Sequence, residues 1–164
     1  MKIPTGLKKS AVLCILKNQG SFLLLKRLKE PNKDMYTPVG GKLDPYENPN
    51  ETAIRETREE TGIEVASFQF CGILVESSPT KYNWINFVYV AEIEHQPPPP
   101  CNEGTLEWIS FDNVLQVPTP KTDWLIYKYV LEGTPFIFNA DFDNELNLLK
   151  MVDELSGKIV VENR

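Results

Sequence analysis

The chain has 164 residues, of which 41% are hydrophobic and 24% charged, with 9 glycines and 13 prolines. This composition is typical of a globular protein and excludes fibrous and intrinsically disordered chains. Seventeen Lys and Arg against 23 Asp and Glu give a net charge of −6, which disfavours binding to nucleic acid polymers and anionic membrane surfaces. No apolar run approaches the roughly 18 to 20 residues of a membrane span.

Cysteine and histidine usage narrows the available chemistry. Cys14, Cys71 and Cys101 are odd in number and far apart, and His95 is the one histidine. This pattern argues against a disulfide framework and against a paired-cysteine zinc site, so we expect a protein of the reducing cytoplasm. With a single histidine, catalysis based on histidine is disfavoured, so any acid–base or metal chemistry must rely on carboxylates.

The first elements form a predicted hairpin followed by a long loop. Residues 10–17 and 21–28 are short, branched and apolar, and the turn between them contains Gly20, a pattern that predicts two neighbouring strands. Residues 29–45 are rich in proline, glycine and polar side chains. They predict a loop with one short strand at 39–43.

A helix is predicted over residues 49–61. Asn48 can cap its first turn, Pro49 suits the first helical position, and Glu51 completes the spacing of a capping box. Gly62 can adopt the left-handed conformation that ends helices. On a helical wheel Ala53 and Thr57 belong to a small stripe that we expect to pack on the sheet.

The remaining pattern predicts a mixed sheet with helices outside it, within one α/β domain over residues 1–164. Residues 145–155 fit a strand and an amphipathic helix about equally well, and a strand is favoured. A second helix would be capped by Thr122 or a neighbour and end at Gly133. The predicted later elements are strands at 67–76, 84–94, 105–109 and 135–139 and a helix at 122–131.

Three carboxylates of the first helix share one face. Glu56, Glu59 and Glu60 fall within an arc of about 100° on the wheel, and like charges four residues apart destabilise a helix unless a cation lies among them. Oxygen ligands of this kind suit a hard divalent ion. The alternative interpretation is an acidic helix face exposed to solvent.

A longer motif around the helix decides between a metal site and an exposed acidic face. Residues 41–63 read GKLDPYENPNETAIRETREETGI. It matches the pattern G-x5-E-x7-R-E-U-x-E-E-x-G-U, with U aliphatic, and so resembles the Nudix box. Seven fixed identities at such spacing arise by chance roughly once in 10⁸ windows, at about 5 to 7% abundance for each residue type. Thr57 departs from the pattern because an aliphatic residue is usual there. The matching positions are Gly41, Glu47, Arg55, Glu56, Glu59, Glu60, Gly62 and Ile63.

The resemblance implies an α/β/α sandwich with a mixed sheet and a hydrolase that uses Mg²⁺ or Mn²⁺ to cleave nucleoside diphosphates linked to another moiety. It implies an ion pair between Arg55 and Glu47 that orients Glu56. Lys42 and Arg27 are placed to contact phosphates. The implied metal ligands are Glu56, Glu59 and Glu60, the Gly40 carbonyl, and Glu103 from a late loop.

Within the family, the chain looks most like the MutT branch, which converts nucleoside triphosphates, including oxidised ones such as 8-oxo-dGTP, to monophosphate and pyrophosphate. Thr37 stands where mammalian 8-oxo-dGTPases carry a base-reading Asn. Tyr36, Asp123 and Trp124 are further candidates for contacting the base, although core packing is the better interpretation of Trp124. We expect a small-molecule nucleotide as partner, no nucleic acid polymer, no membrane, and a monomer or homodimer.

Two alternatives remain open. Pro79, sixteen residues past the box, resembles a spacing associated with ADP-ribose enzymes, so the chain could be an ADP-ribose or dinucleoside-polyphosphate pyrophosphatase. A Nudix fold could instead bind nucleotide without turnover. Retention of Glu56, Glu59 and Glu60 together disfavours this non-catalytic sensor, because a binding protein has little use for all three.

Overall fold

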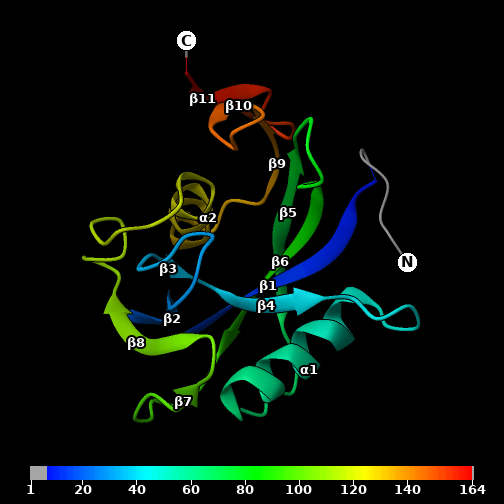
Figure 1. The fold of residues 1–164 in the computed structure, drawn as a ribbon. Helices are drawn as coiled ribbons and strands as arrows, with labels where there is room; N and C mark the ends of the chain where they lie inside the picture. Colours follow the sequence, from blue (N-terminus) through cyan, green and yellow to red (C-terminus); the bar gives the residue numbers. More distant parts are fainter. Residues whose placement is uncertain (1–6, 164) are drawn as a thin grey trace.

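The computed structural model describes residues 7–163, which form one mixed sheet of 11 strands and two helices (Figure 1). The strand order is β11-β10-β9-β5-β6-β1-β2-β8-β7, with β3 beside β2 and β4 beside β1. The strands are β1 (Lys9–Asn18), β2 (Ser21–Arg27), β3 (Tyr36–Thr37), β4 (Val39–Lys42), β5 (Gln69–Ser77), β6 (Trp84–Glu92), β7 (Pro100–Cys101), β8 (Gly104–Ser110), β9 (Phe136–Phe142), β10 (Leu148–Asp153) and β11 (Lys158–Glu162).

Strand β1 organises the sheet because it pairs with three others. It runs parallel to β6 along most of its length. It also pairs with β2 through residues 16–18 and with β4 through residues 11–14, both antiparallel. The strands β2 and β4 thus use different halves of β1, and β4 leads directly towards the first helix.

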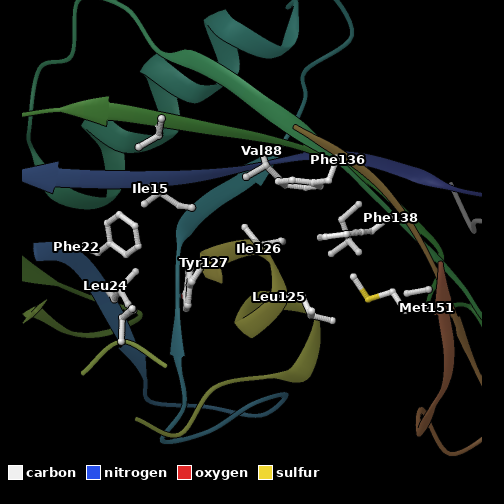
Figure 2. Close-up of a cluster of buried hydrophobic side chains, with 14 of the residues drawn as sticks. Ile15, Phe22, Leu24, Val88, Leu125, Ile126, Tyr127, Phe136, Phe138 and Met151 are labelled. Carbon is white, nitrogen blue, oxygen red and sulfur yellow. The ribbon is translucent and has the colours of Figure 1, made fainter. Parts of the chain in front are cut away.

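The two helices, α1 (Pro49–Thr61) and α2 (Lys121–Glu132), cover opposite faces of this sheet (Figure 1). Side chains alternate along β1, so that Val12 packs in the cluster containing Ala53 of α1, while Ile15 packs in the cluster containing Ile126 of α2. Figure 2 shows the cluster that contains Ile15 and Ile126, between the sheet and α2. The predicted α/β/α sandwich is confirmed. Neither helix in residues 7–163 is long and apolar enough to cross a membrane.

Helix α1 begins and ends where the sequence predicts. The Asn48 side chain accepts a hydrogen bond from the Glu51 amide at 2.9 Å, and Glu51 accepts one from the Asn48 amide at 3.1 Å. Gly62 ends the helix with a φ of 73°, in the left-handed region. These local interactions fix the frame in which the carboxylates of α1 are presented.

Later elements match the expected order with two differences. Helix α2 has Pro120 at its N-cap with no side-chain hydrogen bond, so the predicted Thr122 cap is wrong; Thr122 is buried inside the first turn instead. The strand favoured within residues 145–155 is confirmed as β10, which is flanked by turns. Strands β3, β7 and β11 were not expected, because segments of two to five residues carry too little periodicity.

Thr57 is one of the buried residues of α1 and is fully shielded from solvent. Its hydroxyl oxygen has no hydrogen-bond partner among the described residues. A buried hydroxyl without a partner loses its hydration and gains nothing in return. The departure from an aliphatic residue at this position therefore costs stability and leaves the carboxylates in place.

We expect Thr57→Val to raise the free energy of unfolding by about 1 kcal/mol, because it removes the unpaired hydroxyl at nearly constant volume. Urea unfolding measures the change. The matched control is Thr52→Val, because the equally buried Thr52 hydroxyl donates to Glu47 at 2.7 Å; it should lose roughly 1 to 3 kcal/mol. Equal destabilisation by both variants would contradict this account of Thr57.

Candidate active site

A cavity of about 410 Å³ opens where β2 has separated from β1 and β4 pairs with β1 in its place. Its outer end is lined by Gly40, Lys42, Glu60 and Glu103, which join β4, the last turn of α1 and the loop before β8. The inner end lies against β5, β6 and the start of α2 and is also lined by carboxylates. Arg27 lines the same cavity, so residues far apart in the sequence meet around one space.

Arg55 lies at the centre of an ion-pair network beside the outer end. Its Nε and Nη2 donate to both oxygens of Glu47, and its Nη1 donates to Glu56 at 3.0 Å and to Glu59 at 3.1 Å. Nη2 also donates to the Lys42 carbonyl at 3.2 Å. The guanidinium therefore connects the loop, β4 and α1, and the structure contains the Arg55–Glu47 pair that the resemblance implied.

Glu47 is locked by this network. Hydrogen bonds from Arg55 and then Thr52 hold the pKa of the Glu47 carboxyl at about 2, well below its usual range. Glu47 also accepts the Asp44 amide at 3.2 Å. Because its acceptor capacity is used by these donors, Glu47 acts as a fixed anchor for Arg55.

Glu56 is held from two sides. Its carboxyl receives Arg55, and its side chain is 16% exposed. Gly41 packs directly against this carboxyl, and a Cβ at position 41 would collide with the carboxyl atoms. Any larger residue at position 41 would displace Glu56, which explains the glycine at the start of the box.

Glu60 shows the strongest effect of carboxylate crowding on α1. Burial, followed by the negative charges of Glu56 and Glu103, raises the pKa of Glu60 to about 7, although the Gly40 amide and Arg27 oppose the shift. The carboxylates thus repel one another across the outer end. Glu103 lies in the β7–β8 turn, so the late-loop glutamate implied by the resemblance does reach this site.

This donor set suits a hard divalent cation. Within residues 7–163 no three His, Cys, Asp or Glu side chains converge as a ready ligand set, and Arg55 holds Glu59, whose side chain is 56% exposed. Mg²⁺ needs only one or two protein carboxylates and completes its octahedron with water and phosphate oxygens. Repelling carboxylates beside lysine and arginine therefore fit a cation that shares its shell with a phosphate-bearing ligand.

The predicted substrate contacts divide into two groups. Arg27 and Lys42 line the cavity; Arg27 is fixed by its Nε donating to the Pro31 carbonyl at 2.7 Å. Thr37 also lines it, and its buried hydroxyl lacks a partner among the described residues. Tyr36 does not line the cavity. The neighbouring Glu107 carboxylate, followed by burial, raises the pKa of Tyr36 to about 12. Trp124 donates to the Leu115 carbonyl at 3.0 Å and packs in the core.

The sequence did not indicate that the residues at the inner end of the cavity lie together. Glu76 and Asp123 line it together with Asn86 and Tyr82. Burial, followed by the charge of Glu76, raises the pKa of Asp123 to about 8. Asp123 was proposed as a candidate for contacting the base, but nothing in the sequence linked it to Glu76, because these residues come from β5 and α2.

The raised pKa of Asp123 makes stability depend on pH. The native chain keeps a proton that the unfolded chain releases from its ordinary pKa of 3.8 upwards, so the contribution of Asp123 to the free energy of unfolding falls as pH rises from about 4 to about 8. Asp123→Asn removes this contribution. We expect urea unfolding at pH 6 and pH 8.5 to show a smaller loss of stability in the variant than in the parent chain.

The matched control is Asp112→Asn, which removes the same charge from an exposed turn. It should keep the slope of stability against pH found in the parent chain. If Asp123→Asn kept the parental slope as well, Asp123 would not be the group that holds the proton.

Comparison with known proteins supports this picture. The NUDIX domain model matches residues 7–132. The uncharacterized Nudix hydrolase YvcI of Bacillus subtilis is 28% identical over 125 residues, which cover 73% of this chain and 77% of that protein.

Two solved structures share the fold. The MutT protein of Bacillus halodurans has a TM-score of 0.78 and 28% identity, covering 90% of this chain and 98% of that one. The NUDIX domain of Shewanella oneidensis NrtR, solved with ADP ribose, has a TM-score of 0.65 and 18% identity, covering 77% and 88%. The family model spans both helices and the strands that form the outer end of the cavity. The chain therefore belongs to the NUDIX domain family.

Proposed function

We propose that the chain is a divalent-metal-dependent pyrophosphohydrolase that cleaves a nucleoside triphosphate, including oxidised ones such as 8-oxo-dGTP, to nucleoside monophosphate and pyrophosphate. One observation carries the proposal. The Arg55 network holds the α1 carboxylates beside a cavity whose lining supplies Glu60 and Glu103 together with Arg27 and Lys42. Hydrolysis of a phosphoric anhydride needs this combination of charges.

Each group has a defined task in the proposed reaction. A bound Mg²⁺ or Mn²⁺, held by Glu56, Glu59, Glu60, Glu103 and the Gly40 carbonyl, would supply positive charge to the phosphate oxygens. Lys42 and Arg27 bind further phosphate oxygens. Water forms a new P–O bond, the anhydride P–O bond breaks, and pyrophosphate leaves. The proton of the water passes to a carboxylate at the cavity wall, where Glu60 and Glu103 lie.

The triphosphate assignment is supported by the likeness to a MutT protein at 28% identity. ADP-ribose, the ligand solved with NrtR, defines the alternative substrate class. We infer a cytoplasmic monomer or homodimer that acts on small nucleotides. The non-catalytic alternative predicts nucleotide binding with no product.

With Mg²⁺, the purified chain should release pyrophosphate and monophosphate from dGTP and 8-oxo-dGTP, with the oxidised nucleotide turned over faster. Chromatographic product analysis tests this, with ADP-ribose and a diadenosine polyphosphate in parallel. AMP from ADP-ribose, with both triphosphates left intact, would move the chain to the alternative class. Tight binding without any product would establish the sensor.

The double variant Glu59→Gln and Glu60→Gln should lower kcat about 100-fold or more, equivalent to roughly 3 kcal/mol of transition-state stabilisation. It should still fold, because neither side chain belongs to the core clusters. Glu64→Gln, at an exposed position just past α1, is the matched control and should keep parental activity. Full activity in the double variant would refute the site assignment.

Mg²⁺ alone should raise the Tm of the chain. An ion bound by the native state at 100 times its Kd stabilises it by about 2.7 kcal/mol. Differential scanning fluorimetry with millimolar Mg²⁺ should show the increase in the parent chain and lose it in Glu60→Gln. A parental increase that persists unchanged in Glu60→Gln would remove Glu60 from the binding site.

A further inference from the structure

Position 52 of α1 is left open by the box pattern, which specifies Glu47 and then no residue until Arg55. The structure nevertheless gives Thr52 a defined contact. Its hydroxyl donates to one carboxyl oxygen of Glu47 at 2.7 Å, and the residue is 0% exposed. A second contact, to the Asn48 carbonyl, is longer at 3.3 Å. The better hydrogen bond of this buried hydroxyl therefore goes to the carboxylate.

This bond ties Glu47, which lies in the loop before α1, to the body of the helix. The same oxygen of Glu47 also accepts Arg55 Nη2 at 2.9 Å and the Asp44 amide at 3.2 Å. Arg55 reaches it through a long side chain with several rotatable bonds. The Thr52 hydroxyl, in contrast, is attached directly to Cβ of a residue with a stiff χ1 angle, so it follows the helix backbone. Thr52 therefore fixes the position of Glu47 relative to α1.

The position of Glu47 in turn sets the direction of Arg55. The guanidinium is planar and rigid, and its Nε and Nη2 are both used by Glu47. The remaining nitrogen, Nη1, then donates to Glu56 at 3.0 Å and to Glu59 at 3.1 Å. A displacement of the Glu47 end of this rigid group must therefore move the contacts at its other end.

Glu56 and Glu59 are proposed above as ligands of the divalent cation, so a loosened Glu47 has two effects of the same sign. The two carboxylates lose the group that orients them. The positive charge of Arg55, held less firmly by Glu47, is also left to neutralise Glu56 and Glu59 and lowers their attraction for a cation. Groups that orient metal ligands typically change metal affinity about 10- to 100-fold.

We propose that Thr52 is a positioning residue for the divalent cation. Its hydroxyl fixes Glu47, which in turn fixes Arg55. Arg55 then holds Glu56 and Glu59 in the arrangement that binds the ion. The inference rests on the proposed function and concerns how tightly the cation of that reaction is held.

The test measures binding of Mn²⁺ alone, without nucleotide, from the electron paramagnetic resonance signal of the free ion. Thr52→Val removes the hydroxyl at nearly constant volume and should raise the Kd for Mn²⁺ about 10-fold. Thr52→Ser keeps the hydroxyl donor and should restore the Kd to within about twofold of the parental value. The matched control is Thr57→Val, because Thr57 is an equally buried threonine of α1 whose hydroxyl has no hydrogen-bond partner among residues 7–163. It should keep the parental Kd.

A second pair of variants tests the route through Glu47. Glu47→Ala should raise the Kd for Mn²⁺ at least as much as Thr52→Val does. Adding Thr52→Val to Glu47→Ala should then change the Kd by less than about twofold, because side chains that act through one another are not additive. If Thr52→Val alone does not fold, the measurement is made in the Thr57→Val background, which is expected to add about 1 kcal/mol of stability.

A parental Kd in folded Thr52→Val would overturn the inference and leave the proposed function intact. An equal rise in Thr57→Val, or no recovery in Thr52→Ser, would overturn it by showing that any change in this helix weakens binding. The full effect of Thr52→Val in the Glu47→Ala background would also overturn it. If no nucleotide is hydrolysed, the proposed function fails, and the Mn²⁺ titration still decides the inference. A parent chain that does not bind Mn²⁺ would overturn the inference outright.

Discussion

The contact between Arg55 and its carboxylates is the interaction on which the site depends. A single guanidinium is shared among Glu47, Glu56 and Glu59 and reaches the carbonyl of Lys42 at the end of β4. Without this cation the acidic face of α1 would repel itself and the loop before the helix would lose its anchor. The network brings carboxylates together at the helix surface while leaving Glu60 at the cavity.

The sheet provides the opening for the cavity, which the Arg55 network alone does not form. Because β2 and β4 pair with different halves of β1, the sheet opens at one place without losing its continuous β1–β6 pairing. Both ends of the cavity lie at this opening, with Arg27 of β2 acting electrostatically on Glu60 and on Asp123. The two ends of the cavity therefore present different carboxylates, with Glu60 and Glu103 at the outer end and Glu76 and Asp123 at the inner end.

Much of the fold was predictable because the signals are local. The hairpin of β1 and β2 and both ends of α1 follow from turn and capping residues within a few positions of each other. The cap of α2 was mispredicted because Thr122, a common capping residue, is buried in the first turn. Strands as short as β3 and β7 have no periodic signal, and they form because β2 and β8 offer neighbouring edges.

The amino-acid sequence alone predicts the acidic helix, its caps and the Arg55–Glu47 spacing, since all lie within 23 residues governed by helical geometry. It also indicated Glu103, through the family resemblance. Long-range packing, in contrast, places the Tyr36 hydroxyl where Glu107 raises its pKa, and it brings Glu76 and Asp123 into the wall of one cavity. These arrangements join β3 to β8 and β5 to α2, and no local pattern encodes them, because long-range packing fixes which side chains share a buried space.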